Sequence, residues 1–99
     1  MRFNHYGVVG EIDTLPGCSQ VAIFHSVFNP GVRGEGRGKL AHDARIDQAR
    51  YLGYNTALCT VDMSNTIQLG ILEKTGWKCV HTFNSIKTKH DVGIFVKDV

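Results

Sequence analysis

The alternation of apolar and polar positions in the first third of the chain predicts a β-hairpin. Residues 3–12 place Val8, Val9 and Ile12 between polar residues, which favours a strand. Residues 13–17 read as a turn, because they contain a proline, which presets φ, and a glycine, which accepts positive φ. Residues 19–28 then return as a second strand, which an Asn-Pro-Gly sequence ends.

A helix is predicted over residues 36–52, and Gly53 is its stop signal. Small apolar residues recur on one of its faces with helical periodicity, so the helix can lie close on a sheet: Ala41, Ala44, Ala49 and Leu52. Arg45 and Arg50 are assigned to its solvated face. Because residues 54–61 read as a buried strand, the strand–helix–strand unit predicts a parallel pair with a right-handed crossover.

The second half of the chain predicts one more helix and two more strands. The helix covers residues 65–75, with Ser64 or Asp62 as its N-cap and a glycine after its end. Strands over residues 77–83 and 91–97 follow, separated by a polar turn. The predicted order is therefore β-β-α-β-α-β-β, an α/β (α+β) fold. A chain of 99 residues has the length of one domain, so residues 1–99 are assigned to one.

Composition argues against several classes of protein. The net charge of +2 is too small to favour nucleic-acid binding, and basic residues are not interleaved with aromatic ones. No apolar run approaches the ~20 residues of a membrane span, and no signal peptide is visible. The odd set Cys18, Cys59 and Cys79 and the five scattered histidines lack metal-site spacing. We therefore expect reduced thiols, a cytoplasmic protein, and no metal, membrane or nucleic-acid partner.

Residues 33–39, Arg-Gly-Glu-Gly-Arg-Gly-Lys, carry the clearest candidate chemistry. A glycine-rich turn before a helix N-terminus offers N–H groups to an anion, and three basic side chains add positive charge. A Walker loop is excluded because Leu40 follows Lys39, and a dinucleotide fingerprint would need glycine at position 39. The pattern that remains is R-x-x-G-x-G, fulfilled by Arg33, Gly36 and Gly38.

This pattern resembles the acetyl-coenzyme A pyrophosphate loop of the GNAT acetyltransferase superfamily. The likeness extends over roughly residues 21–80, because N-T-I-Q-L-G-I-L-E-K-T-G-W at residues 65–77 is similar to the second motif of that family. The resemblance implies a GNAT-like mixed, mostly antiparallel sheet with a central parallel strand pair. It also implies an N-acetyltransferase that moves an acetyl group from acetyl-CoA to a primary amine of an unknown acceptor. The implied cofactor-binding residues are Val27, Phe28, Asn29, Arg33, Gly34, Glu35, Gly36, Arg37, Gly38, Lys39 and Asn65.

The resemblance leaves the catalytic acid and base open. Many family members hold an acidic residue on the strand before the loop, where this chain offers His25. An imidazole, with its ordinary pKa of about 6.5, can accept a proton at neutral pH, so His25 is the candidate base. A structural histidine is the alternative, and Glu11 is a second candidate base. Leu72 stands where many members place a proton-donating tyrosine, and Ser64 is the nearby hydroxyl.

Family members also usually carry two helices that help to wall the acceptor pocket, and this chain has nothing of that length before Phe3. We therefore expect a minimal GNAT, or one whose acceptor wall comes from a second subunit in a homodimer. A catalytically degenerate CoA-binding or structural module is the alternative function, and a small basic nucleic-acid binder is a third. Compact members also occur in viral genomes, so the cytoplasm could be that of a host cell.

Overall fold

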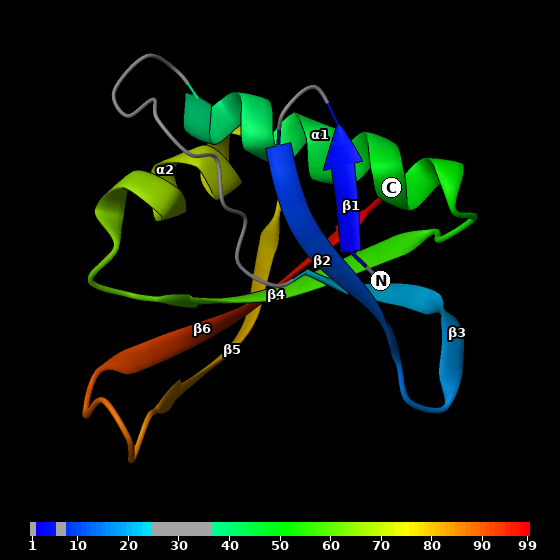
Figure 1. The fold of residues 1–99 in the computed structure, drawn as a ribbon. Coiled ribbons are helices and arrows are strands. Elements are labelled where there is room, and N and C mark those ends of the chain that lie inside the picture. The colour runs from blue at the N-terminus through cyan, green and yellow to red at the C-terminus, as the bar shows by residue number, and fades with distance from the viewer. Residues whose placement is uncertain (1, 6–7, 25–36) are drawn as a thin grey trace. The chain divides into compact units, whose positions relative to one another are not determined.

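The computed structural model describes residues 2–5, 8–24 and 37–99 (Figure 1). Along the chain its elements are β1 (Arg2–His5), β2 (Val8–Leu15), β3 (Cys18–Phe24), α1 (Arg37–Tyr51), β4 (Thr56–Asp62), α2 (Thr66–Lys74), β5 (Lys78–Asn84) and β6 (Asp91–Asp98). The strands are hydrogen-bonded in the order β1-β2-β3-β4-β6-β5. Helix α1 connects the neighbours β3 and β4, which is the long connection that parallel strands require. The predicted mixed α+β fold is confirmed.

The chain divides into two compact units. Unit 1 comprises Met1–Ala57 and Asp98–Val99, and unit 2 comprises Leu58–Lys97. The boundary between them falls within β4. The assignment of residues 1–99 to one domain stays a prediction.

Unit 1 begins with two antiparallel pairings. Strand β1 pairs with β2 from Arg2↔Glu11 to His5↔Val8, and β2 pairs with β3 through a register that shifts near Leu15. Gly17 has φ +81°, as the predicted turn requires. The prediction of one strand over residues 3–12 is wrong, because that stretch contains both β1 and the start of β2. Both strands are rich in residues that strands tolerate, so the prediction did not separate them.

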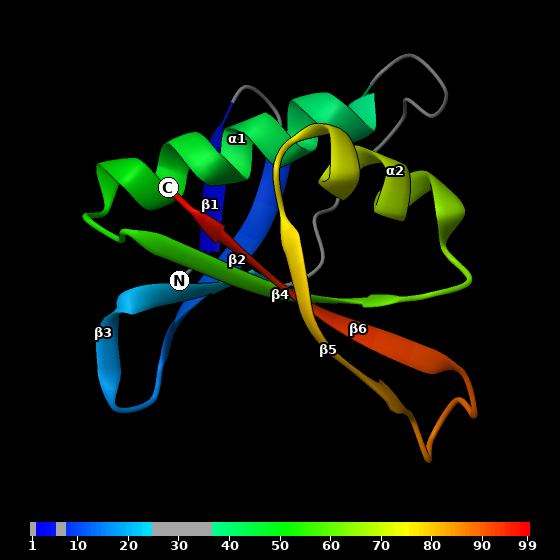
Figure 2. The ribbon, with the colours of Figure 1, turned by 180° about the vertical axis from the view of Figure 1, so that it is seen from behind.

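Helix α1 runs alongside β1 and β2 in both Figure 1 and Figure 2. Ala44 and Ala49 are buried as predicted, and Gly53 with φ +89° follows the helix end. The assignment of Arg45 to the solvated face is wrong, because its side chain is only 8% exposed. Its guanidinium carbon lies 5.2 Å from the centroid of the Phe24 ring, a cation–π contact that periodicity of apolar residues alone does not reveal.

Unit 2 contains α2 and the β5–β6 hairpin (Figure 2). The hairpin pairs antiparallel from Lys78↔Val96 to Asn84↔Asp91. The residues of unit 2 that form its buried apolar core are Cys59, Val61, Leu72, Trp77 and Phe95. Every residue of β5 is exposed, and this strand lies at the end of the strand order.

Side chains form hydrogen bonds with backbone groups at both ends of α2. The N-cap is Asn65, whose side-chain oxygen accepts a hydrogen bond from the Gln68 N–H at 3.1 Å. The predicted N-caps Ser64 and Asp62 are therefore wrong, since these two residues bond to each other instead. At the other end Gly76 has φ +86°, and the Lys97 ammonium donates to the Thr75 carbonyl at 2.5 Å.

The three thiols differ in exposure. Cys18 in unit 1 and Cys79 in unit 2 are exposed, whereas Cys59 on β4 is buried. The three thiols form no disulfide with one another.

Candidate functional site

Most of the predicted site lies outside the described residues. This holds for His25, Val27, Phe28, Asn29, Arg33, Gly34, Glu35 and Gly36. The predicted cofactor residues Arg37, Gly38 and Lys39 form the first turn of α1. The glycine-rich sequence therefore leads directly into a helix N-terminus, which is the arrangement that the anion-binding hypothesis requires.

Asn65, the remaining predicted cofactor residue, lies in unit 2 and caps α2. Its side-chain oxygen is engaged by Gln68, so the residue has a local structural task. A contact between Asn65 and a cofactor stays a prediction.

The other positions considered for proton transfer are Glu11, Leu72 and the tyrosines. Glu11 lies on β2 and is exposed. Leu72 is fully buried in α2, so the residue at the family's tyrosine position belongs to the core of unit 2. Tyr51 is 85% exposed, and the hydroxyl of Tyr54 is 2.6 Å from the Thr14 hydroxyl.

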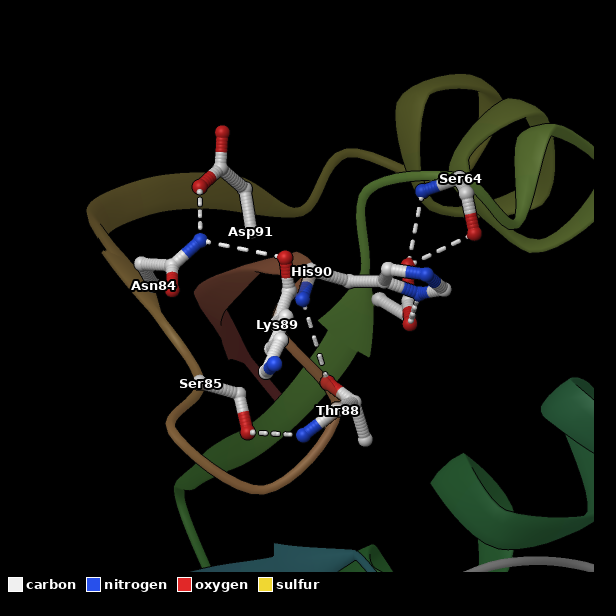
Figure 3. A network of polar contacts seen from close by, with 8 residues as sticks. Ser64, Asn84, Ser85, Thr88, Lys89, His90 and Asp91 are labelled. Atoms are coloured by element: carbon white, nitrogen blue, oxygen red, sulfur yellow. Dashed lines mark hydrogen bonds and ion pairs between the residues drawn. The ribbon is translucent and has the colours of Figure 1, made fainter.

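A polar group that the sequence did not predict joins the end of β4 to the start of β6 (Figure 3). It consists of Asp62, Ser64 and His90, called here the Asp62–His90 cluster. One oxygen of Asp62 accepts hydrogen bonds from the Ser64 backbone N–H at 2.9 Å and the Ser64 hydroxyl at 2.7 Å. The other oxygen lies 2.8 Å from Nδ1 of His90.

These contacts keep Asp62 ionised. The Ser64 hydroxyl, the Ser64 N–H and then His90 lower the pKa of Asp62 from 3.8 to about 2. An ionised carboxylate only accepts hydrogen bonds, so His90 must donate from Nδ1. In the neutral imidazole this leaves the lone pair on Nε2, and the His90 side chain is 58% exposed.

The turn before β6 holds His90 through its backbone. The Ser85 N–H donates to the His90 carbonyl at 2.8 Å, and the Lys89 N–H donates to the Ser85 carbonyl at 2.7 Å. The His90 N–H donates to the Thr88 hydroxyl at 3.3 Å. The Asn84 amide donates to the Lys89 carbonyl and to the Asp91 carboxylate. Figure 3 draws the bond from His90 to the Thr88 hydroxyl and the two bonds from the Asn84 amide.

Sequence reasoning missed this cluster because Asp62 and His90 are separated by 28 positions. They meet because β4 ends beside the start of β6, where the Met63 N–H donates to the Asp91 carbonyl at 2.8 Å. The predicted polar turn over residues 84–90 was the local signal, and it does not show that His90 contacts the end of β4.

The residues described by the structure contain no group of three or more His, Cys, Asp or Glu side chains that could hold a metal ion. Neither of the two described helices is long and apolar enough to cross a membrane.

No protein-family model and no curated protein sequence matches the chain. Solved structures do match. An IAA acetyltransferase from Bacillus cereus superposes with a TM-score of 0.78 at 13% identity, over 93% of this chain and 69% of the other. An acetyltransferase of the GNAT family from Streptococcus pneumoniae gives a TM-score of 0.73 at 18% identity, over 93% of this chain and 57% of the other.

The chain has the GNAT fold. A further similar structure is the NatC complex bound to a Gag peptide and CoA, with a TM-score of 0.76 at 14% identity. It covers 93% of this chain and 59% of the other. The chain spans less than two thirds of the length of several acetyltransferase structures that it matches. The fold predicted from the loop and helix motifs is confirmed by these structures.

Proposed function

We propose that this GNAT-fold chain is an N-acetyltransferase that moves an acetyl group from acetyl-CoA to a primary amine. The observation that carries the proposal is that the sequence R-x-x-G-x-G, residues 33–38, runs into the first turn of α1, in a chain whose fold is that of acetyltransferases. Two of the similar structures support the co-substrate, since one is described with CoA and another with acetyl-CoA.

In this proposal the glycine-rich loop and the first turn of α1 bind the pyrophosphate of the co-substrate. Gly36 and Gly38 give phosphate oxygens access to backbone N–H groups, and Arg33, Arg37 and Lys39 supply positive charge. Backbone groups of residues 27–29 bind the acyl arm, and Asn65 contacts the co-substrate from α2. The acceptor is a primary amine whose class is open.

Calorimetry with acetyl-CoA tests the proposal directly. The wild-type chain should bind, and Gly36→Asp should abolish binding because it adds a side chain and a negative charge at the pyrophosphate site. Gly36→Ala is the matched control, since it adds a methyl group without charge and should bind more tightly than Gly36→Asp. A wild-type chain that gives no heat and no thermal shift at millimolar acetyl-CoA would overturn the proposed function.

One observation favours a CoA-binding module without turnover as a second candidate. Leu72 fills the core of unit 2 at the position where many family members carry the tyrosine acid. Mass spectrometry of amine mixtures incubated with acetyl-CoA separates the two functions. Binding without any acetylated product would favour the module.

A further inference from the structure

Strand β5 is an edge strand of the sheet. It stands at the end of the strand order, and among the described strands β6 is its one neighbour. All seven of its residues, Lys78–Asn84, are exposed. An edge strand directs alternate backbone N–H and C=O groups away from its neighbour, so a further extended chain can pair with the outer side of β5.

Large apolar side chains are exposed on this edge strand and in the turn after it. Val80 is 57% exposed and Phe83 is 42% exposed, and Ile86 in the turn is 95% exposed. All three belong to the β5–β6 hairpin of unit 2, whose tip lies away from α2 in Figure 2. A partner that covers these side chains removes apolar surface from water, which favours association.

The hairpin is also basic. Its residues 78–97 contain four lysines and a single aspartate. Three of the lysines are exposed, with Lys78 at the start of β5 and Lys87 and Lys89 in the turn after its end. The aspartate, Asp91, already accepts a hydrogen bond at 3.2 Å from a side-chain amide of β5. Positive charge therefore flanks the edge strand at both ends, and its complement is an acidic partner.

The same features disfavour a second copy of this chain as the occupant of the edge. The register between β5 and β6 shifts between Cys79 and His81. Bulges and lysines on edge strands are features by which proteins keep two such edges from pairing with each other. In an antiparallel pair of two copies the start of one β5 meets the turn after the other, so Lys78 would face further lysines.

We propose that the outer edge of β5 binds an extended acidic polypeptide segment as an additional strand. The backbone of the segment pairs with the edge, and its apolar side chains cover Val80 and Phe83. Carboxylates near its two ends meet Lys78 and the lysines of the turn. Backbone pairing distinguishes this occupant from a nucleic acid, which would use the lysines alone. The inference goes beyond acetyl transfer and does not depend on it.

The probe is the fluorescein-labelled octapeptide Glu-Asp-Val-Thr-Val-Thr-Glu-Asp with an acetylated N-terminus. The seven residues of β5 span about 23 Å, which an extended octapeptide covers. Fluorescence anisotropy should show saturable binding to the wild-type chain. The affinity should fall as salt is raised, because salt screens the attraction between exposed charges.

Charge reversal tests the lysines. Lys78→Glu and the double variant Lys87→Glu/Lys89→Glu should each raise the Kd by about fivefold or more, since an exposed ion pair contributes up to about fivefold and reversal makes it repulsive. A peptide with lysines in place of its acidic residues should bind these variants more tightly than wild type. Arg50→Glu is the control, because Arg50 is 56% exposed but lies on α1, and it should keep the wild-type Kd.

N-methylation of the peptide tests the backbone pairing. Successive N–H groups of an extended strand point to opposite sides, so only one alternate set can face β5. Methylating that set should abolish binding, whereas methylating the other set should leave the Kd nearly unchanged. Attraction by charge alone would make the two sets equivalent, and equal affinity of the two methylated peptides would therefore overturn the proposal.

The remaining outcomes also decide the question. Absence of saturable binding at millimolar peptide would overturn the proposal. Binding of a single-stranded oligonucleotide without binding of the peptide would replace it with a nucleic-acid surface. A dimer in light scattering that Phe83→Glu converts to a monomer would show a second copy on the edge. The assay contains no acetyl-CoA, so a chain that binds the peptide but not acetyl-CoA would count against the proposed function alone.

Discussion

Leu72 should be the residue of α2 whose truncation costs most. Its side chain is 0% exposed, so Leu72→Ala removes buried apolar surface and leaves a cavity in the core of unit 2. Substitutions of this kind typically cost about 2–5 kcal/mol of unfolding free energy. For a domain of this size each kcal/mol lowers Tm by roughly 4–8 °C, so a loss of ~3 kcal/mol should lower Tm by roughly 12–24 °C. Thermal and urea unfolding followed by circular dichroism measure both quantities.

Two variants make the Leu72 test specific. Leu72→Met conserves volume and should cost less than about 1.5 kcal/mol. Ile67→Ala lies on the same helix but truncates a side chain that is 80% exposed, so it should stay within about 0.5 kcal/mol of wild type. If Leu72→Ala and Ile67→Ala melt within a degree or two of each other, Leu72 does not occupy a packed core.

The same burial bears on the missing tyrosine. Leu72→Tyr would restore the residue type of the family, but it adds a ring and a hydroxyl at a fully buried position. Overpacking costs typically about 1–3 kcal/mol, and an unsatisfied buried hydroxyl adds a similar amount. We expect this variant to lose stability without gaining turnover, and a gain in kcat at unchanged Tm would contradict this.

Three further predictions concern charge, acid stability and association. Arg33→Ala and Arg37→Ala should weaken acetyl-CoA binding, and the loss should be largest at low salt because salt screens the phosphate charge. Arg50, whose side chain is 56% exposed on α1, provides the control, and Arg50→Ala should bind like wild type. Unchanged calorimetric affinity in the first two variants would contradict a phosphate-binding role. Because the pKa of Asp62 is lowered to about 2, its stabilising contribution is present above about pH 4 and lost as the pH falls toward 2. Asp62→Asn should therefore flatten urea-derived stability between pH 5 and 2, and a slope equal to wild type would refute this. Light scattering at tens of micromolar should give twice the 11.0 kDa chain mass, and a monomer mass would count against the homodimer.

The sequence was informative where the signal is local. Periodicity located the helices and most strands, and the glycines at positions 17, 53 and 76 marked turns that do require positive φ. It failed at residues 3–12, where one strand was predicted and the structure has β1 and the start of β2. It also misplaced Arg45, because the contact with the Phe24 ring joins two elements that the chain separates.

The candidate site also has a part that local sequence predicts and a part that it does not. The R-x-x-G-x-G motif is a run of adjacent residues, so its chemistry can be recognised from order and spacing alone. The contact between Asp62 and His90 depends on where β4 ends relative to β6 and on the shape of the turn that carries Lys89. Neither the place where β4 ends nor the shape of that turn can be read from a periodic pattern in the sequence. The competing N-caps of α2 are a smaller case, since Asp62, Ser64 and Asn65 are all good capping residues and only the backbone path selects Asn65.

The distribution of thiols has a practical consequence for spectroscopy. Unit 1 carries one exposed thiol, Cys18, and unit 2 carries another, Cys79, while the third, Cys59, is buried. A donor and an acceptor fluorophore attached to the two exposed sulfurs would label each unit once, without any engineered cysteine. Loss of label anisotropy at each site would then report the unfolding of that unit separately, and alkylation of Cys59 would mark the opening of the core of unit 2.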